Sequence, residues 1–282
     1  MSQFPNVYFV CVHKGASTFV AANLFPSLAR RCKQYSVYQV GHTYVDWFLK
    51  NRDPLGLDPT YDDTELTRRL KMMFSENPIP QTGCLVGRLY PQHIPAICQH
   101  LNAEFPVADS RVFVMRRDPR DALVSMYFSK AYSHDEKAML TSARQDSIES
   151  TRNRIREMGI YHWLENVLAN PNSREIMNEF TFCANLLATD SGVVDLPYEQ
   201  LTTHPQEWLT TFVKHAGLER IVGEAWFTEM KNHLIPPETE DKYQHKRRVT
   251  PGGWKEVFDD KLTYLLKNRI GEQMEQLQYD WD

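Results

Sequence analysis

The chain has 282 residues, of which 42% are hydrophobic and 24% are charged, a globular composition that excludes wholesale disorder, collagen and low-complexity scaffolds. Lysine and arginine total 32 and aspartate and glutamate total 36, which gives a formal net charge of −4. So balanced a charge provides no global field that would draw the protein onto nucleic acid, and any anion-binding site must therefore be local.

The cysteines and the N-terminal segment bear on the compartment in which the protein works. The 5 cysteines are odd in number and no pair has CxxC spacing, so free thiols in a reducing compartment are favoured over disulfides or a cysteine zinc site. Residues 1–29 carry one charge, Lys14, with no basic segment before the apolar run and no clean cleavage site. The sequence thus predicts a soluble, cytoplasmic protein with no transmembrane segment.

The first predicted unit is a strand, a tight turn and a helix. Residues 6–12 read Asn-Val-Tyr-Phe-Val-Cys-Val, a run without polar alternation that is typical of a strand covered on both faces. A turn at 13–18 follows, and then an apolar run with helical spacing to about residue 29.

Strands and helices alternate along the rest of the chain. Further strands are predicted at 35–40, 84–89, 111–115 and 192–196. Helices are predicted at 65–74, 92–101, 119–132, 136–158, 206–216, 222–232 and 257–277, and loops at 50–62 and 236–254. This alternation, without an internal repeat or a break in composition, predicts an α/β fold with a central parallel sheet in a single domain, residues 1–282.

The turn at 13–18 reads His-Lys-Gly-Ala-Ser-Thr and has the features of a phosphate cradle. In open α/β sheets ligands lie beyond the carboxyl ends of the strands, and a tight loop that opens a helix there directs backbone N–H groups at an anion. Lys14 adds a positive charge, and Ser17 and Thr18 add hydroxyl donors. The turn is not a Walker A loop, because its Lys precedes the small residues. A capped helix start without a ligand is the alternative.

Two further segments carry clustered cations. Residues 116–127 read Arg-Arg-Asp-Pro-Arg-Asp-Ala-Leu-Val-Ser-Met-Tyr, so a strand delivers arginines to a helix start, with Arg117 and Ser125 eight residues apart. Residues 246–255 read Lys-Arg-Arg-Val-Thr-Pro-Gly-Gly-Trp-Lys, in which the glycines allow close approach to a polyanion. For both segments a solvated basic surface is the alternative interpretation.

These segments, in this order and spacing, resemble those of the sulfotransferases that use 3′-phosphoadenylyl sulfate (PAPS). Residues 13–19 are similar to that family's Pro-Lys-Ser-Gly-Thr-Thr-Trp loop, which binds the 5′-phosphosulfate. Residues 117–127 match its Arg-Asn/Asp-Pro-x-Asp-x-x-Val-Ser-x-Tyr segment, which binds the 3′-phosphate. Residues 198–201 resemble its Tyr-Glu-x-Leu motif, whose Tyr approaches the adenine, and residues 247–254 resemble its final Arg-Lys-Gly-x-x-Gly-Asp-Trp loop. The resemblance implies a three-layer sandwich with a P-loop-like sulfotransferase fold.

The activity that the resemblance implies is in-line transfer of the sulfuryl group from PAPS to an acceptor hydroxyl, with an amine less favoured, releasing adenosine 3′,5′-bisphosphate. Lys14 is the implied catalytic cation, which stabilises charge on the leaving oxygen. The implied donor-binding residues are Lys14, Gly15, Ala16, Ser17, Thr18, Phe19, Arg117, Ser125, Tyr198, Arg247, Arg248 and Gly252. No metal is expected, because the sulfuryl group carries less charge than a phosphoryl group and nothing in the sequence resembles a magnesium or zinc site.

The catalytic base is not transferable from the resemblance. Leu89 stands where cytosolic members of the family carry a His, and Ala16 replaces a usual Gly. His42, which follows a predicted strand, is the candidate base, because a His has a suitable pKa for this work. His13 is expected to orient the cradle. Other candidates are Asp46 and His93, and a carboxylate base stays an open alternative. Arg88 and Tyr90 are candidates for binding the acceptor.

Two other functions remain open at this point. A P-loop-like nucleotide kinase would need Mg²⁺ and ATP, and the missing Walker A loop disfavours it. A non-catalytic nucleotide-binding protein of the same fold would account for the absent histidine. The aromatic residues near the expected acceptor side permit a small-molecule, carbohydrate or lipid acceptor. The family's C-terminal dimer motif is not evident, so the oligomeric state is open.

Overall fold

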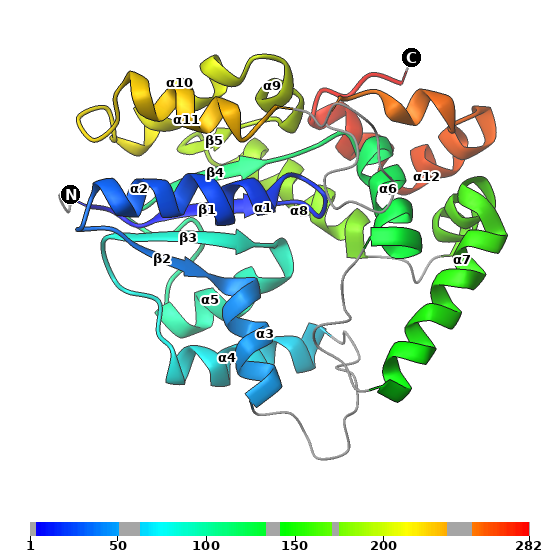
Figure 1. Ribbon diagram of the computed structural model, residues 1–282, viewed down its shortest axis with the longest axis horizontal. Helices are drawn as coiled ribbons and strands as arrows, with labels where there is room; N and C mark the ends of the chain where they lie inside the picture. The colour runs from blue at the N-terminus through cyan, green and yellow to red at the C-terminus, as the bar shows by residue number, and fades with distance from the viewer. Residues whose placement is uncertain (1–3, 51–62, 134–141, 171–174, 236–249, 282) are drawn as a thin grey trace.

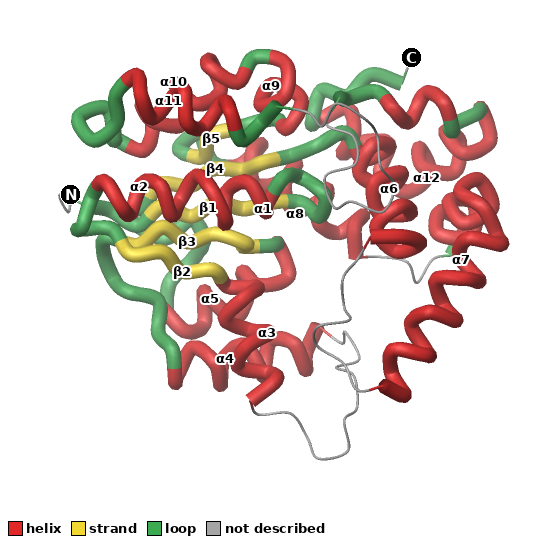
Figure 2. Tube along the Cα trace, viewed as in Figure 1, coloured by secondary structure: helices red, strands yellow, loops and turns green. Residues whose placement is uncertain are grey.

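The centre of the molecule is a parallel sheet with helices on both faces (Figures 1 and 2). The computed structural model describes residues 4–50, 63–133, 142–170, 175–235 and 250–281. The strands are β1 (Val7–Cys11), β2 (Ser36–Gln39), β3 (Cys84–Leu89), β4 (Arg111–Met115) and β5 (Val193–Asp195), in the spatial order β2-β3-β1-β4-β5. All neighbouring strands are parallel. The predicted strands and the parallel sheet are confirmed, with each strand end within about one residue of the prediction.

Helices fill most of the connections between the strands. They are α1 (Ser17–Phe19), η1 (Val20–Leu24), α2 (Phe25–Arg31), α3 (Val40–Lys50), α4 (Asp63–Glu76), η2 (Pro91–His93), α5 (Ile94–Leu101), α6 (Pro119–Phe128), η3 (Ser129–Ser133), α7 (Ser142–Ala169), α8 (Glu175–Thr189), α9 (Tyr198–Thr203), α10 (Pro205–Ala216), α11 (Glu224–Asn232), η5 (Gly253–Glu256) and α12 (Asp260–Gln276).

Four helices differ from the sequence-based predictions. α3, α8 and α9 were not predicted. α3 mixes β-branched and aromatic residues, and α9 is a short helix that directly follows Pro197. The helix predicted at 136–158 is α7, which continues to Ala169 past a break at Gly159, where φ is 75° and ψ is 162°. The loops predicted at 50–62 and 236–254 lie for the most part outside the described residues.

Alternating residues of β1 face two separate hydrophobic clusters, one on each side of the sheet. Val7, Phe9 and Cys11 pack with residues of α2, α10 and α11. Tyr8, Val10 and Val12 pack with residues of α4, α5, α6, α8 and α12. The strand is completely buried, as the unbroken apolar run predicted, so the residues that follow it emerge from a rigid base.

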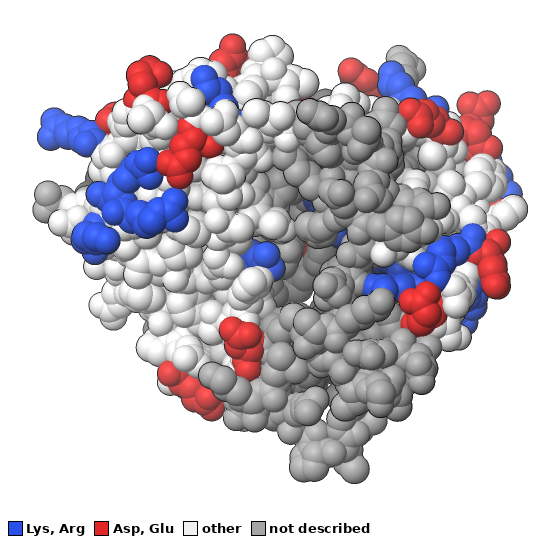
Figure 3. All heavy atoms as spheres, in the orientation of Figure 1, with Lys and Arg blue, Asp and Glu red and all other residues white. Residues whose placement is uncertain are grey.

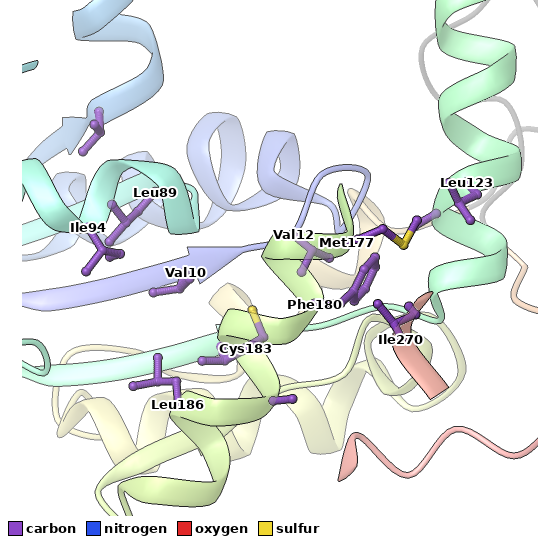
Figure 4. Packing of buried hydrophobic residues seen from close by; sticks show 14 of the residues in the cluster. Val10, Val12, Leu89, Ile94, Leu123, Met177, Phe180, Cys183, Leu186 and Ile270 are labelled. Carbon is purple, nitrogen blue, oxygen red and sulfur yellow. The ribbon is translucent and has the colours of Figure 1, made fainter. Parts of the chain in front are cut away.

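Helix α8 packs across the carboxyl half of β1. Figure 4 shows Met177, Phe180 and Cys183 of α8 near Val10 and Val12, with Met177 extending toward Leu123 of α6, and all of these side chains belong to one cluster. The helix is thereby held beneath the turn that follows β1. None of the described helices is both long enough and apolar enough to span a membrane.

Candidate active site

The turn after β1 forms a cradle of backbone N–H groups at the carboxyl end of the sheet. Lys14 and Ala16 have φ angles of 64° and 56°, in the left-handed region, and the Gly15 N–H donates to the Val12 carbonyl at 3.0 Å. A Cβ on Gly15 would lie 3.0 Å from that oxygen and 3.2 Å from the Met115 carbonyl oxygen, so a larger residue would require these backbone groups to shift. Backbone turned in this way presents successive N–H groups to one side, which is a concavity that binds anions.

Lys14 is the cationic side chain of the cradle. Its Nζ donates to the Ser129 hydroxyl at 2.6 Å, at the start of η3. Burial, followed by the positive charges of Arg117 and Lys130, lowers the pKa of Lys14 to about 8. Positive groups held this close destabilise one another, so a bound anion would be favoured here.

Arg117 joins the second predicted segment to the first. Its Nη1 donates to the Lys14 carbonyl at 2.7 Å, although 103 residues separate the two positions. Its guanidinium carbon lies 4.3 Å from the centre of the Tyr198 ring, in a cation–π contact. The Arg117 residue is 7% exposed, and its Nε is buried with no hydrogen-bond partner among the described residues. A donor in that state is able to bind an acceptor that the chain does not supply.

The motif at 198–201 braces the arginine. The Tyr198 N–H donates to the Arg116 carbonyl at 2.8 Å, and Glu199 accepts from the Asp118 N–H at 2.8 Å. Arg116 itself is bound by Asp195 of β5, at 2.9 Å from its Nε. Of the two adjacent arginines, Arg116 therefore holds the sheet edge together while Arg117 faces the cradle.

Helix α6 presents hydroxyl groups toward the cradle. Ser125 lies in the second turn of α6, and Ser129 follows it by four residues, which places both on the same face of a helix. Because Ser129 contacts Lys14, that face is turned to the cradle. Sequence reasoning singled out Ser125 and missed Ser129, although the helical spacing would have found it.

A second group of polar side chains lies on the β3 side of the cradle. The Ser17 hydroxyl is 2.9 Å from the Tyr90 hydroxyl, and the rings of Tyr90 and His13 are stacked with centroids 4.3 Å apart. The His13 N–H donates to Glu179 Oε2 at 2.7 Å, and His13 Nδ1 bonds to Glu179 Oε1. Sequence reasoning did not find Glu179; the only signal was an acid within a largely apolar run.

His42 and Arg88 lie near this group. His42 is exposed in the first turn of α3, and burial, then Arg88, lowers its pKa while Asp46 opposes the shift. A Cβ on Gly41 would lie 3.5 Å from the Arg88 carbonyl oxygen and 3.9 Å from the Tyr90 ring, so the start of α3 is beside the end of β3. The structure thus brings together the residues predicted for the acceptor side.

The loop before η5 is anchored to α6. Asp121 accepts hydrogen bonds from the Gly252 N–H at 2.6 Å and the Trp254 N–H at 2.9 Å. Gly252 has a φ of 88°, and the Trp254 ring lies 3.6 Å from the guanidinium carbon of Arg120. The predicted residues Arg247 and Arg248 lie outside the described residues.

The remaining predicted residues follow the cradle into the first helix. Thr18 is partly buried in α1. Phe19 is 7% exposed and packs in the core, with its ring centroid 6.4 Å from that of Trp208.

Cations on the outer surface are dispersed. Figure 3 shows the Lys and Arg side chains of one face in small groups, several with Asp or Glu alongside. Arg30 and Arg31, for example, both pair with Glu229, at 3.3 Å and 2.7 Å. Within the described residues there is no group of three or more His, Cys, Asp or Glu that could hold a metal ion.

Comparisons with known proteins agree with this geometry. A family model described as the sulfotransferase domain matches residues 30–278. Among solved structures, the mouse sulfotransferase SULT7A1 complexed with PAP has a TM-score of 0.55 at 12% identity, and the alignment covers 99% of this chain and 89% of that one. Retinol dehydratase in complex with androsterone and inactive cofactor PAP has a TM-score of 0.46 at 13% identity, covering 96% of this chain and 80% of that one. No curated protein matches the chain.

The family match covers most of the chain, and the fold is that of the sulfotransferase structures. The predicted fold class is confirmed. The chain therefore belongs to the sulfotransferase family and is an enzyme of sulfuryl transfer.

Proposed function

We propose that this single-domain protein transfers the sulfuryl group of PAPS to an acceptor hydroxyl, with an amine the less favoured acceptor, and releases adenosine 3′,5′-bisphosphate (PAP). The observation that carries the proposal is the contact between Arg117 and the Lys14 carbonyl. It brings together the cradle that would receive the 5′-phosphosulfate and the segment that would receive the 3′-phosphate.

The residues of the cradle fit a phosphosulfate group. Gly15 lets the turn pack closely against Val12 and Met115, and Lys14 supplies a partly buried cation. Gly15, Ala16, Ser17 and Thr18 would bind the group through backbone N–H and hydroxyl donors. Phe19, in the core behind the cradle, would lie nearest the adenine side.

The 3′-phosphate would be bound by Arg117 and Ser125. Support comes from the buried Arg117 Nε, which has no partner in the described part of the chain, and from the orientation of α6. Tyr198 would hold the guanidinium in place and border the adenine. Gly252, and Arg247 and Arg248 that precede it in the sequence, would also bind the nucleotide.

The chemistry requires positioning and charge neutralisation more than covalent help. PAPS, when bound, supplies an activated sulfuryl group on a phosphate leaving group. Lys14 would hold its ammonium beside the leaving oxygen and stabilise the charge that develops there. Arg88 and Tyr90 would line the acceptor side, where a small molecule, carbohydrate or lipid would bind. His42 is the base that the sequence suggested.

A thermal-shift comparison tests the donor. PAP is expected to raise the melting temperature, whereas ATP with Mg²⁺ is not. The kinase hypothesis is not favoured by the family match, and it predicts the reverse order. Labelled PAPS with a panel of hydroxyl compounds then separates an enzyme from a non-catalytic binder, and turnover is expected to survive EDTA.

Arg117→Ala sharpens this test. It is expected to weaken PAP binding by at least about a hundredfold, since charge-assisted bonds to two anionic oxygens are lost. Arg116→Ala is the matched control, because Arg116 bonds to Asp195 instead. Calorimetry that finds equal PAP affinity in parent and Arg117→Ala would contradict the assignment.

A further inference from the structure

We infer that His13 is the general base that accepts the proton of the acceptor hydroxyl, and that Glu179 is its positioning residue. This inference rests on the proposed function and names a catalytic group that the family's motifs do not supply here. Its starting point is the stacked and hydrogen-bonded arrangement of His13, Glu179 and Tyr90 beside the cradle.

Glu179 fixes the orientation and tautomer of the His13 ring. The Glu179 side chain is 2% exposed, and its two oxygens are bound by the backbone N–H and by Nδ1 of the same residue, His13. A carboxylate only accepts hydrogen bonds, so Nδ1 carries the ring proton. In the neutral ring, Nε2 then has the lone pair and can accept a proton.

The position of Glu179 is set by the core. Its neighbour Phe180 is completely buried and belongs to one hydrophobic cluster with Val12 and Met177 (Figure 4). A carboxylate buried in such a place needs fixed donors. The helix therefore carries Glu179 to the end of β1 and keeps it there.

The Tyr90 ring stacks on one face of the His13 ring and restricts its rotation. The two ring planes differ by 6°, and the Tyr90 hydroxyl is in turn bonded to Ser17 of the cradle. The His13 side chain is nevertheless 41% exposed. An imidazole clamped at Nδ1 and on one face, yet open to solvent, is accessible to a substrate.

The position of His13 suits the reaction. It precedes Lys14 directly, so the base and the cation that stabilises the leaving oxygen emerge from the same turn. As the acceptor oxygen bonds to sulfur, its proton passes to His13 Nε2. The bond between sulfur and the 5′-phosphate oxygen breaks, and its electron pair remains on that oxygen beside Lys14. The imidazolium that forms is balanced by Glu179.

Other ionisable groups surround His13. Glu179 faces it from α8, Tyr90 from the end of β3, His93 from η2 and Lys14 from the cradle. Burial, and then the charge of His13, lowers the pKa of His93 to about 3, so His93 stays neutral and is not a competing base. His42 is the remaining histidine near the acceptor side.

The test uses His13→Asn, whose amide can still donate to Glu179 but has no basic nitrogen. Turnover of labelled PAPS is measured with two probe acceptors, phenol and 4-nitrophenol, at pH 8. The kcat with phenol is expected to fall by about 10²–10⁴-fold. The loss with 4-nitrophenol is expected to be below about tenfold, because that acceptor is already ionised and needs no base. PAP affinity is expected to stay within about threefold.

Two further variants complete the test. Glu179→Gln is expected to lower kcat for phenol by about tenfold or more without changing PAP affinity, since the ring loses its orientation. His162→Asn removes a histidine from an exposed His–Glu pair on α7, at 3.3 Å, and is expected to leave kcat unchanged. In ¹⁵N NMR spectra, His13 is expected to carry its proton on Nδ1 in the parent protein and to lose that preference in Glu179→Gln.

The outcomes separate the inference from the proposed function. If the parent neither binds PAP nor turns over PAPS, the proposed function fails. If the parent is active and His13→Asn keeps its phenol rate, or loses equally with both phenols, the inference alone fails. A large loss in His42→Asn with an unaffected His13→Asn would move the base to His42. A proton found on His13 Nε2 would also overturn the inference, even if neither phenol is turned over.

Discussion

At the scale of single residues, the cradle depends on Gly15, where space for a side chain is limited, and on Ala16, whose backbone is in the left-handed conformation. Gly15→Ala places a Cβ 3.0 Å from the Val12 carbonyl oxygen, and we expect a loss of about 1–3 kcal/mol in the free energy of unfolding. The displaced N–H groups should also weaken PAP binding at least tenfold. Urea unfolding and calorimetry measure the two effects.

Ala16→Gly is the reverse substitution at the next residue, since it removes a methyl group where Gly15→Ala adds one. The left-handed conformation of Ala16 costs about 1–2 kcal/mol, which glycine avoids, while glycine's greater freedom in the unfolded chain costs about 0.5–1 kcal/mol. The variant should therefore be as stable as the parent or up to about 1.5 kcal/mol more stable. A marked destabilisation would show that the Ala16 methyl group has a packing role that outweighs its backbone strain.

The lowered pKa of Lys14 predicts a pH dependence of PAP binding. Lys14 is charged below its pKa of about 8, and a bound anion favours the charged form. Above that pH binding must take up a proton, so the Kd for PAP should rise about tenfold per pH unit toward pH 9.5. Calorimetry in buffers of different ionisation enthalpy measures both the Kd and the proton uptake.

Lys14→Arg is the control, because an arginine stays charged and should give a flat profile between pH 8 and 9.5. The stability of the free protein changes with pH in the opposite direction. The unfolded chain holds the Lys14 proton more tightly than the folded protein does. The free energy of unfolding therefore increases as the pH rises from about 8 toward the ordinary pKa of a lysine. A flat PAP profile in the parent would show that Lys14 does not contact the anion.

Residues that belong to a contiguous motif were predictable, and residues supplied from elsewhere were not. The sequence indicated Lys14 and Arg117, because each follows a clear strand and a turn signal. It gave no sign of Glu179, since a buried carboxylate is meaningful only once its partner is known to be His13. It also gave no sign that Arg116 would bind Asp195 while Arg117 contacts the Lys14 carbonyl.

At the scale of elements, strands were easier to predict than helices. β1 and β4 are apolar runs buried on both faces, a pattern that few other structures produce. α3 begins with Val40 directly after β2, so its first residues continue the pattern of a strand. α8 has only two aromatic residues, Phe180 and Phe182, and its buried side chains belong to the same hydrophobic cluster as Tyr8 and Val10 of β1.

The anchoring of the loop before η5 is a prediction at this scale. In Asp121→Asn the amide NH₂ faces a backbone N–H and can accept no hydrogen bond there. Because Asp121 is buried, we expect a loss of about 1–3 kcal/mol in the free energy of unfolding. PAP affinity should also fall, since this loop continues from Arg247 and Arg248. The exposed Asp260→Asn serves as the control for urea unfolding and calorimetry.

At the scale of the whole molecule, the strand order creates the site. β1 has β3 on one side and β4 on the other, so the turns after these three strands emerge next to one another (Figure 1). The connection after β1 leads to β2 on one side of the sheet, and the connection after β4 leads to β5 on the other. Ligands bind in open α/β sheets at a point where neighbouring connections diverge in this way. Segments 13–19, 84–90 and 116–129 therefore meet at one edge although they are far apart in the sequence.

This convergence predicts a pattern of hydrogen exchange. Addition of PAP should slow amide exchange in 13–19, 116–129 and 250–254 together, because one ligand would order all three segments. Amides of α11, which packs on the opposite face of the sheet from α6 and α8, should change little. Arg117→Ala should abolish the slowing in all three segments at equal PAP concentration, since it removes the ligand's binding. Protection confined to 13–19 would mean that the cradle binds an anion without the second segment, and the proposed nucleotide site would then be wrong.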